Sequence, residues 1–530
     1  MGFHRLQNAL LFLLEIILLL IISSSSPFIL CDDDLINLNS PLPPNFLFGT
    51  ASSSYQFEGA YLADGKGLGN WDVYTHIPGN IIDGSNGDIA VDHYHRYLED
   101  VNLMSSLGVN SYRFSISWSR ILPKGIYGDV NPEGVNFYSK LIDALLLKGI
   151  EPFLTLTHYD IPQELEDRYG GWLSPKSQND FTYFAETCFK QFGNRVKYWV
   201  TFNEPNIQAM SGYRFGTNPP SRCSTHFGNC SNGDSEREPF IAAHNMILSH
   251  AAAVHVYRTK YQKEQGGSIG IVLQALWHEP LSNSMADKAA AERARSFTLN
   301  WFLDPIIHGK YPAEMEDIAG SVLPKFSTSD QEKLNMALEF IGINHYTSYY
   351  VQDCINSSCE PGFGVSWTEG LYQQSSERTG VPIGESLPGT VDWINVYPQG
   401  MEKIVTYVME RYNNTPMFIT ENGYGFAENL ETNTKETLHD DYRVKYMADY
   451  LDALLTAVRK GADVRSYFAW SLLDNFEWKY GYTVRFGLHQ VDYATLKRSK
   501  KLSATWYKEF IEKHKGKVII PQHNGEGFQY

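Results

Sequence analysis

Short runs of apolar, β-branched and aromatic residues alternate with long amphipathic stretches along most of the chain. We predict that these runs are strands, and they cover residues 45–51, 110–118, 151–158, 197–204, 268–274, 339–346, 416–422 and 464–474. The stretches between them, such as residues 133–150, 240–262 and 440–461, have the periodicity of amphipathic helices. Parallel strands require crossover connections of this length, whereas antiparallel hairpins do not.

A strand followed by a helix, eight times over, predicts an α/β fold of the (β/α)8 type, the TIM barrel. Such a barrel needs only about 250 residues, so the rest of the chain is expected in long βα loops. The longest irregular stretches, residues 205–240 and 351–398, follow the fourth and sixth predicted strands, at the end where barrel enzymes carry their sites. No Pro-, Gly- or Ser-rich linker is evident, so we expect one domain over residues 32–530 with a short tail after about residue 515.

The first 31 residues have the pattern of a secretory signal peptide. His4 and Arg5 give a basic start, residues 10–22 are mainly apolar, and a break rich in Ser and Pro follows. An uncleaved membrane anchor is the alternative, but Glu15 interrupts the apolar run, which is shorter than the ~20 residues that a span needs. We therefore expect removal of approximately residues 1–31, secretion, and no membrane partner for the mature protein.

The six cysteines suit an exported protein. Cys223 and Cys230 bracket one short polar loop, and Cys354 and Cys359 bracket another, so two local disulfides are predicted. Cys188 lies in an amphipathic run and is expected to be a buried free thiol. Neither pair has the CxxC spacing of zinc or thioredoxin chemistry. Sequons that permit N-linked glycans occur at Asn229, Asn356 and Asn413.

The charge balance argues against polyanionic partners. Lys and Arg number 44 against 60 Asp and Glu, a formal net charge of −16, which repels nucleic-acid phosphates and anionic lipid headgroups.

The spacing of His93 and His95 suggests metal ligands, but residues two apart on a helix point in different directions. The Gly-rich stretch 64–70 follows no predicted strand, so it does not indicate a nucleotide site. We expect a neutral small-molecule partner, no metal and no organic cofactor.

Two glutamates end apolar runs, Glu204 in KYWVTFNEPN and Glu421 in ITENG. Pro205 cannot continue a strand ladder and favours extended backbone at Glu204, and the Asn-Gly pair after Glu421 is a strong turn signal. The ends of parallel strands share one rim, so both carboxyls are expected there. Each could instead pair with an Arg and have no catalytic role. A pair of carboxyls across a barrel mouth suits glycoside hydrolysis, in which one protonates the leaving oxygen and the other attacks the sugar or activates water.

Several long motifs resemble those of plant family 1 glycoside hydrolases, the retaining β-glucosidases. These motifs are ASSSYQFEG, YRFSISWSR, LTHYDIPQEL, TFNEPN, ITENG and WSLLDNFEW, and the resemblance runs in order from about residue 40 to residue 513. It implies that Glu204 is the general acid/base and Glu421 the nucleophile that forms a covalent glucosyl-enzyme. A retaining mechanism needs the carboxyls roughly 5 to 5.5 Å apart, one protonated and the other ionised.

The resemblance also implies roles for residues around the two carboxyls. Arg113, Tyr346 and Asn344 correspond to residues that support the nucleophile and the acid/base, and an Arg nearby is expected to depress the pKa of Glu421. Asn203 is expected to donate to the sugar 2-hydroxyl. The other glucose-binding positions are Gln56, His158, Trp470, Glu477, Trp478 and Phe486. The leaving group, or aglycone, is expected at Trp393, Phe202, Ile207, Phe215 and Tyr349.

The substrate class follows from particular positions. Family members that cleave thioglucosides carry Gln in place of the acid, whereas Glu204 is intact, so O-glucosides are expected. Members that take 6-phosphosugars lack a carboxylate at Glu477, which would repel a phosphate.

The chain most resembles the monolignol (coniferin-type) β-glucosidases. We therefore expect β-glucosides of phenolic aglycones such as coniferin and syringin as substrates, in the cell wall or alternatively the vacuole. Flavonoid, cyanogenic and oligosaccharide glucosides are alternatives, as are transglucosylation and non-catalytic sugar binding. The sequence gives no expectation for the oligomeric state.

Overall fold

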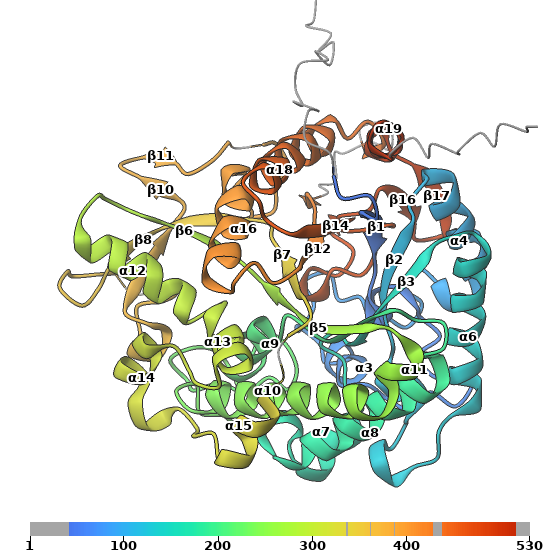
Figure 1. Cartoon of the computed structure of the whole chain (residues 1–530), viewed down its shortest axis with the longest axis horizontal. Coiled ribbons are helices and arrows are strands. Elements are labelled where there is room, and N and C mark those ends of the chain that lie inside the picture. The colour runs from blue at the N-terminus through green and yellow to red at the C-terminus, as the bar shows by residue number, and fades with distance from the viewer. Residues whose placement is uncertain are drawn as a thin grey trace, which may run out of the picture. The chain divides into compact units, whose positions relative to one another are not determined.

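The computed structural model describes residues 42–515 except residues 335, 337, 361, 386 and 428–436. Eight parallel strands close into a barrel in the order β1-β14-β12-β7-β5-β4-β3-β2. These strands are β1 (Leu47–Ala51), β2 (Ser111–Ser115), β3 (Glu151–Thr157), β4 (Tyr198–Asn203), β5 (Ser268–Gln274), β7 (Ile341–Asn344), β12 (Met417–Asn422) and β14 (Val464–Ala469). Figure 1 shows the helices around them, and the predicted (β/α)8 barrel is confirmed.

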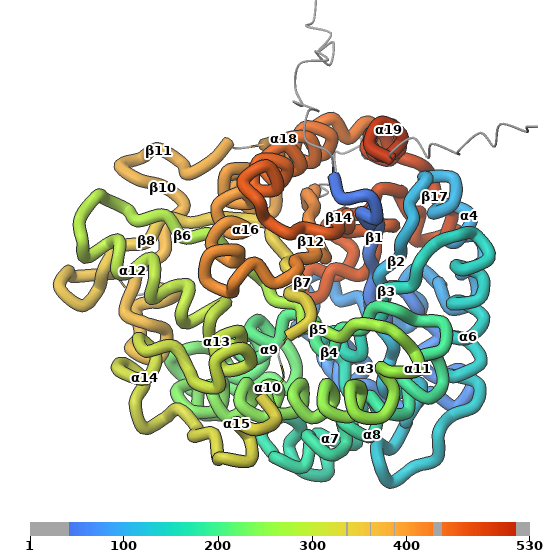
Figure 2. The backbone as a smooth tube through the Cα atoms, in the orientation of Figure 1, coloured from blue at the N-terminus to red at the C-terminus, as the bar shows by residue number. Residues whose placement is uncertain are grey.

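The first and last strands close the barrel. β1 pairs with β2 on one side and with β14 on the other, and Figure 2 shows the blue start of the described chain beside the red-orange β14. Gly49 of β1 permits this close packing, because a Cβ there would lie 2.2 Å from a ring carbon of Phe468. The ring of Phe153 lies 5.1 Å from that of Phe468 and 5.4 Å from that of Phe418. Aromatic side chains therefore fill the barrel core, in keeping with a packed interior rather than a pore.

The helices follow from local signals in the sequence. In α6 (Pro132–Leu147) Pro132 takes the first position, where its missing N–H is no loss, and the Asn131 side chain accepts a hydrogen bond from the Glu133 N–H. Tyr138, Leu141, Ile142 and Leu145 form its buried stripe. The longer helices are α4 (His93–Leu107), α6, α8 (Lys176–Phe192), α10 (Glu238–Val256), α12 (Met285–Ser296), α16 (Gln399–Arg411), α18 (Asp441–Arg459) and α19 (Leu502–His514). Shorter helices include α2 (Ser54–Phe57), α3 (Asn70–Thr75), α7 (Gln163–Tyr169), α9 (Pro205–Tyr213), α13 (Asn300–His308), α14 (Ala313–Ala319) and α15 (Thr328–Leu334).

The long βα loops carry the two predicted disulfides. Cys223 is bonded to Cys230 after β4, and Cys354 is bonded to Cys359 after β7. Cys188 is a buried free thiol. The stretch expected to be irregular after the sixth barrel strand instead adds small sheets outside the barrel. Their strands are β8 (Ser348–Asp353), β9 (Tyr372–Ser375), β10 (Glu377–Arg378) and β11 (Val381–Pro382). β6 (Trp277–Pro280), which follows β5, pairs with β8.

The signal peptide and the tail after about residue 515 lie outside the described residues. Among the residues described, no helix combines the length and apolarity that a membrane span requires. The sequon residues Asn229, Asn356 and Asn413 are exposed, although the Asn356 amide donates to Asp353 at 3.1 Å. Glycan attachment at these positions stays a prediction.

The two histidines considered as metal ligands take separate carboxylate partners. His93 Nδ1 lies 2.8 Å from Asp100 Oδ2 in the core, and His95 Nδ1 lies 2.6 Å from Asp92 Oδ1 near the surface. Within the described part of the chain, no group of three or more His, Cys, Asp or Glu is placed to hold a metal ion.

Candidate active site

Glu204 lies at the junction between β4 and helix α9. β4 ends at Asn203, and Glu204 adopts the left-handed backbone region with φ 44° and ψ 53°. Its N–H donates to the Val272 carbonyl of β5 at 2.8 Å, and its carbonyl accepts from the Ile207 N–H at 3.0 Å. The chain thus turns from strand to helix at one residue. The expectation of an extended backbone at Glu204 is therefore wrong. A bulky residue in this region is strained, and such strain concentrates at functional sites.

Glu421 lies near the end of β12, opposite Asn344 of β7. The glycine that follows, Gly423, passes close to β14. A Cβ at this position would lie 2.0 Å from the Trp470 carbonyl oxygen, so a side chain cannot be accommodated without a shift of the backbone. The Asn-Gly pair therefore serves a close approach of two segments at the barrel rim.

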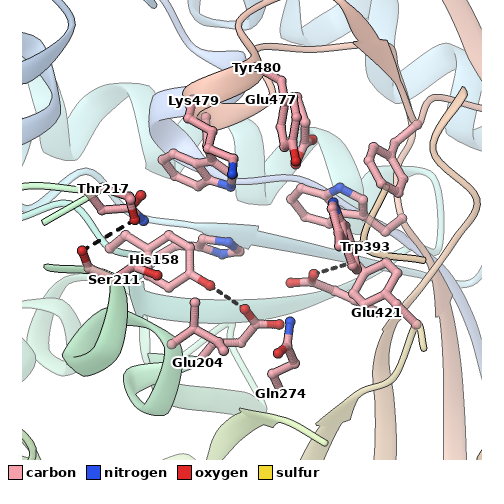
Figure 3. Close-up of a pocket in the computed structure, with 17 residues that line it drawn as sticks. His158, Glu204, Ser211, Thr217, Gln274, Trp393, Glu421, Glu477, Lys479 and Tyr480 are labelled. Atoms are coloured by element: carbon pink, nitrogen blue, oxygen red, sulfur yellow. Dashed lines mark hydrogen bonds between the residues drawn. The ribbon is translucent and has the colours of Figure 1, made fainter. Parts of the chain in front are cut away.

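Both carboxyls line one cavity of about 190 Å³. Figure 3 shows Glu204 and Glu421 on opposite sides of this space, with Glu477, Lys479 and Tyr480 along another edge. Ten of the residues expected from the sequence line it: His158, Glu204, Ile207, Tyr346, Trp393, Glu421, Trp470, Glu477, Trp478 and Phe486. Strands far apart in the sequence thus bring the expected residues to one place.

Glu421 is held by a cation and a phenol. Arg113 Nη1 lies 2.5 Å from Glu421 Oε1, and the Tyr346 hydroxyl donates to Oε2 at 2.7 Å. All three side chains are buried, and Arg113 is fully so. A buried carboxylate needs such partners to remain ionised. This arrangement suits a nucleophile.

Glu204 is held by neutral donors instead. The Asn344 amide donates to Glu204 Oε1 at 2.8 Å, and the Tyr159 hydroxyl donates to Oε2 in a short contact. No Lys or Arg within the described residues forms an ion pair with Glu204. The site thus places a cation beside one carboxyl and not beside the other.

Burial raises the pKa of Glu204 to about 7, and the nearby charge of Glu421 contributes to this rise. Burial also raises the pKa of Glu421, while Arg113 and the Tyr346 hydrogen bond lower it. The expected effect of Arg113 has the right sign, but the expectation of a net depressed pKa is wrong because burial outweighs it. Since only Glu421 contacts a cation, we assign the proton of this coupled pair to Glu204.

Asn203 and His158 are fixed by the same network. Asn203 Oδ1 accepts from Arg113 at 2.6 Å and from Asn344 at 3.1 Å, so its Nδ2 faces His158 Nε2 at 3.0 Å. Burial lowers the pKa of His158, and the charge of Arg113 lowers it further. His158 is therefore neutral, with Nε2 as an acceptor and its hydrogen on Nδ1. Among the described residues His158 Nδ1 is buried and has no partner.

Glu477 and Gln56 form a second polar corner. Burial raises the pKa of Glu477 to about 8, and the charges of Glu421 and Glu204 add to this rise. Gln56 lies behind Glu477, where its Nε2 donates to the Phe476 carbonyl at 2.8 Å and lies 3.5 Å from Glu477 Oε2. Gln56 thus positions Glu477 and does not itself line the cavity. Three carboxyls around one space disfavour an anionic ligand.

The expected aglycone residues separate into three groups. Trp393 and Ile207 line the cavity, and Tyr349 supports Trp393 by donating to its carbonyl at 2.7 Å. Phe215 lines a neighbouring cavity instead. Phe202 is a wrong assignment, because it is fully buried and its ring lies 4.5 Å from that of Phe181 on α8. Successive strand side chains point to opposite faces, so with Asn203 facing the barrel interior Phe202 faces the helices.

The structure adds cavity residues that the sequence analysis did not identify. They are Tyr159, Ser211, Thr217, Asn218, Gln274, Lys479 and Tyr480. Tyr159 directly follows His158 in the motif LTHYDIPQEL, so the sequence did contain a signal for it. Most of the others lie on helix α9 or in loops, whose path no periodicity in the sequence reveals.

Comparison with known proteins places these residues in context. The family model described as glycosyl hydrolase family 1 matches residues 38–516. The chain is 58% identical to beta-glucosidase 47 of Arabidopsis thaliana over 473 residues, which are 89% of this chain and 85% of that one. It is 57% identical over 475 residues to a probable inactive beta-glucosidase 14 of Oryza sativa subsp. japonica, with 89% and 91% covered.

A coniferin beta-glucosidase of Pinus contorta is 51% identical over 479 residues, which are 89% of this chain and 92% of that one. Among solved structures, the rice Os3BGlu6 beta-glucosidase matches with a TM-score of 0.85 and 47% identity, covering 88% of this chain and 98% of that one. The family model covers all of the described residues, including both carboxyls of the cavity. This chain therefore belongs to glycosyl hydrolase family 1.

Proposed function

We propose that this family 1 glycosyl hydrolase is a retaining β-glucosidase for O-β-glucosides of phenolic aglycones, in particular monolignol glucosides such as coniferin and syringin. The observation that carries the proposal is the asymmetry of the two carboxyls in one cavity. Glu421 contacts Arg113, whereas Glu204 contacts only neutral donors. Retaining hydrolysis requires one ionised and one protonated carboxyl of this kind.

In the first step, Glu421 attacks the anomeric carbon while Glu204 gives its proton to the glycosidic oxygen. The bond to the aglycone breaks, and a glucosyl ester forms on Glu421. In the second step, Glu204 takes a proton from water, which attacks the same carbon and restores Glu421 as a carboxylate. Arg113 and Tyr346 stabilise the carboxylate before the first step and after the second.

The cavity suits a neutral hexose. Trp470 and Trp478 offer apolar faces. The imidazole of His158 lies nearly parallel to both indoles, at 21° to Trp470 and 19° to Trp478. Glu477 and His158 supply polar groups along the cavity wall. Aromatic faces with a few polar groups are typical of carbohydrate recognition.

The phenolic aglycone is supported by the aromatic outer wall, where Trp393 and Tyr480 line the cavity. A planar guest stacks on such side chains with little loss of conformational freedom. The monolignol choice within this class is supported by the 51% identity to the coniferin beta-glucosidase of Pinus contorta. We further propose secretion to the cell wall, which the two disulfides support because such bonds persist in oxidising compartments.

A panel of kcat/KM values tests the substrate class, because this ratio measures discrimination directly. Coniferin, syringin, a flavonoid glucoside, a cyanogenic glucoside and cellobiose are compared under one condition. We expect the two monolignol glucosides to have the highest values. Equal values across the panel would reduce the proposal to a general β-glucosidase. Parallel product analysis with added alcohols measures any transfer of glucose to acceptors other than water.

A non-catalytic sugar-binding protein is the second candidate, because one relative at 57% identity is a probable inactive β-glucosidase. The intact contacts of Glu204 and Glu421 favour an enzyme. Incubation with an activated 2-deoxy-2-fluoro-β-glucoside separates the two, because the fluorine slows release of the glucosyl ester. We expect mass spectrometry of the peptides to find the sugar on Glu421. An unlabelled protein that still binds glucose would favour the second candidate.

A further inference from the structure

A second cavity of about 120 Å³ lies against helix α9, and we call it the α9 side cavity. Its defining residues are Asn206, Met210, Phe215, Phe240, Trp301 and Phe363. No step of the proposed hydrolysis uses it. Its volume is of the same order as the ~150 Å³ apolar cavity known to accept benzene in another protein, so it has room for about one aromatic ring.

The walls of this cavity are aromatic and carry no unbalanced charge. The rings of Phe240 and Trp301 meet edge to face at 5.4 Å, and those of Phe215 and Phe363 lie 5.9 Å apart. The one acidic wall residue, Glu369, accepts from the buried Arg214 at 2.9 Å. A neutral aromatic guest therefore fits this cavity better than a charged one.

Two buried polar atoms in the wall lack partners within the described residues. The Asn206 Nδ2 donates to the Gln274 carbonyl at 2.9 Å, which leaves its Oδ1 without a donor. Trp301 Nε1 is likewise without an acceptor. Asn206 is 4% exposed and Trp301 is 2% exposed, so bulk water does not satisfy either atom. Such orphaned atoms in an otherwise apolar cavity indicate a guest that carries a hydroxyl group.

The side cavity and the active-site cavity share a wall. Ile207, Ser211 and Gln274 line both of them. Asn206 and Met210 lie one position earlier on α9 and face the side cavity only. Residues four apart lie on one face of a helix, so two adjacent stripes of α9 border the two spaces. The two spaces therefore adjoin along α9, the helix that follows Glu204.

We infer that the α9 side cavity is a second aromatic subsite that receives the far, hydroxylated ring of a two-ring aglycone. This inference rests on the proposed function and extends its substrate class from one-ring phenols to two-ring phenols. The far ring packs among Phe215, Phe240 and Trp301, and its hydroxyl donates to Asn206 Oδ1. A free one-ring phenol has the same chemistry and is the competing occupant that the experiment must distinguish.

The test uses the full secreted enzyme and three substrates: phenyl β-glucoside, biphenyl-4-yl β-glucoside and 4′-hydroxybiphenyl-4-yl β-glucoside. Met210→Trp fills the side cavity, and Met210→Leu is the matched control of conserved volume. The measured quantity is the ratio of the kcat/KM values for the hydroxybiphenyl and phenyl glucosides. We expect Met210→Trp to lower this ratio roughly tenfold and Met210→Leu to change it less than about twofold. Thermal unfolding checks that both variants fold.

Asn206→Leu tests the hydroxyl contact separately. In the unchanged enzyme we expect kcat/KM to be roughly tenfold higher for the hydroxybiphenyl glucoside than for the biphenyl glucoside. The biphenyl glucoside has no hydroxyl on its far ring, so it leaves Asn206 Oδ1 buried and unpaired. In Asn206→Leu this preference should disappear. Its persistence would overturn the assignment of Asn206.

Other outcomes overturn the inference in distinguishable ways. An unchanged substrate ratio in Met210→Trp, with phenyl β-glucoside still hydrolysed, removes the second subsite and leaves the proposed function standing. A second outcome is that free phenol binds in the presence of saturating glucose, and that Met210→Trp abolishes this binding while the substrate ratio stays constant. This outcome would assign the cavity to a separate phenol. Absence of hydrolysis of all three glucosides by the unchanged enzyme overturns the proposed function and this inference together.

Discussion

Replacement of Tyr159 by Phe tests how the proton of the acid/base is held. The Tyr159 hydroxyl donates to Glu204 Oε2, and Asn344 donates to Oε1. Tyr159 is 6% exposed, so its oxygen is not simply replaced by bulk water when it is removed. The lost donor stabilised the carboxylate form of Glu204 more than the protonated form. Tyr159→Phe should therefore raise the pKa of Glu204 above its present value of about 7.

The size of the shift follows from the strength of the contact. A hydrogen bond to a charged group contributes about 1.5–3 kcal/mol, and one pKa unit corresponds to about 1.4 kcal/mol. We expect a rise of about 1 unit, because Asn344 and the remaining dipoles of the site compensate part of the loss. Glu204 must carry its proton in the first step, so activity is lost as the pH rises through its pKa. The basic limb of the pH profile should move about 1 unit upwards.

The assay is the pH dependence of kcat/KM, which reports groups of the free enzyme. Phenyl β-glucoside is suitable because its poor leaving group needs the proton. The acidic limb should stay in place, since Glu204 is protonated there in both proteins and presents no charge to Glu421. Tyr346→Phe is the matched control: it removes a donor from Glu421, so it should move the acidic limb upwards and leave the basic limb in place.

Two results would refute this reasoning about Tyr159. A basic limb that stays in place would mean that the hydroxyl does not affect the proton of Glu204. A shift of the acidic limb in Tyr159→Phe, with no shift in Tyr346→Phe, would exchange the roles of the two carboxyls.

Three further predictions concern catalysis, recognition and stability. Glu421→Gly should lower kcat on the order of 10⁴-fold or more, because no glucosyl ester can form, and steady-state kinetics measures this. Glu477→Gln should lower kcat/KM for glucosides by roughly tenfold while the melting temperature stays similar, since the amide keeps the shape but has an NH2 donor where the carboxyl has its second oxygen. Asp474 is buried between Lys501 at 2.7 Å and Arg485 at 3.1 Å, so Asp474→Asn should destabilise the protein by about 3–5 kcal/mol in denaturant unfolding. Burial raises the pKa of Asp474, but these two cations lower it below its usual value. The ion pairs therefore stabilise the folded wild-type protein at neutral pH, and this stabilisation should fade as the pH falls through the pKa of Asp474.

The barrel was accessible from the sequence because its signals are local. Each barrel strand is an apolar run of predictable length, and each crossover is an amphipathic stretch such as α6 or α18. Parallel strands place their carboxyl ends on one rim, so a glutamate at the end of each of two strands is enough to predict that Glu204 and Glu421 lie at the same end of the barrel. The two short disulfides follow from spacing in the same way.

Details of the site depended on contacts that spacing does not encode. The alternation of β4 puts Asn203 towards the site and Phe202 towards α8, and the sequence motif alone did not separate these two directions. The left-handed backbone of Glu204 arises from the bond of its N–H to β5 together with the start of α9. The net pKa of Glu421 depends on how completely the folded chain removes it from water.

The sequence by itself determined the order of strands and helices, the two carboxyls at the strand ends and the family to which the chain belongs, because these are properties of residues close together in the chain. Only the tertiary structure decided that Tyr159 contacts Glu204 and that a second cavity borders α9. Those features join residues that are far apart in the chain. Their geometry is fixed by the packing of strands, helices and loops, which no local pattern specifies.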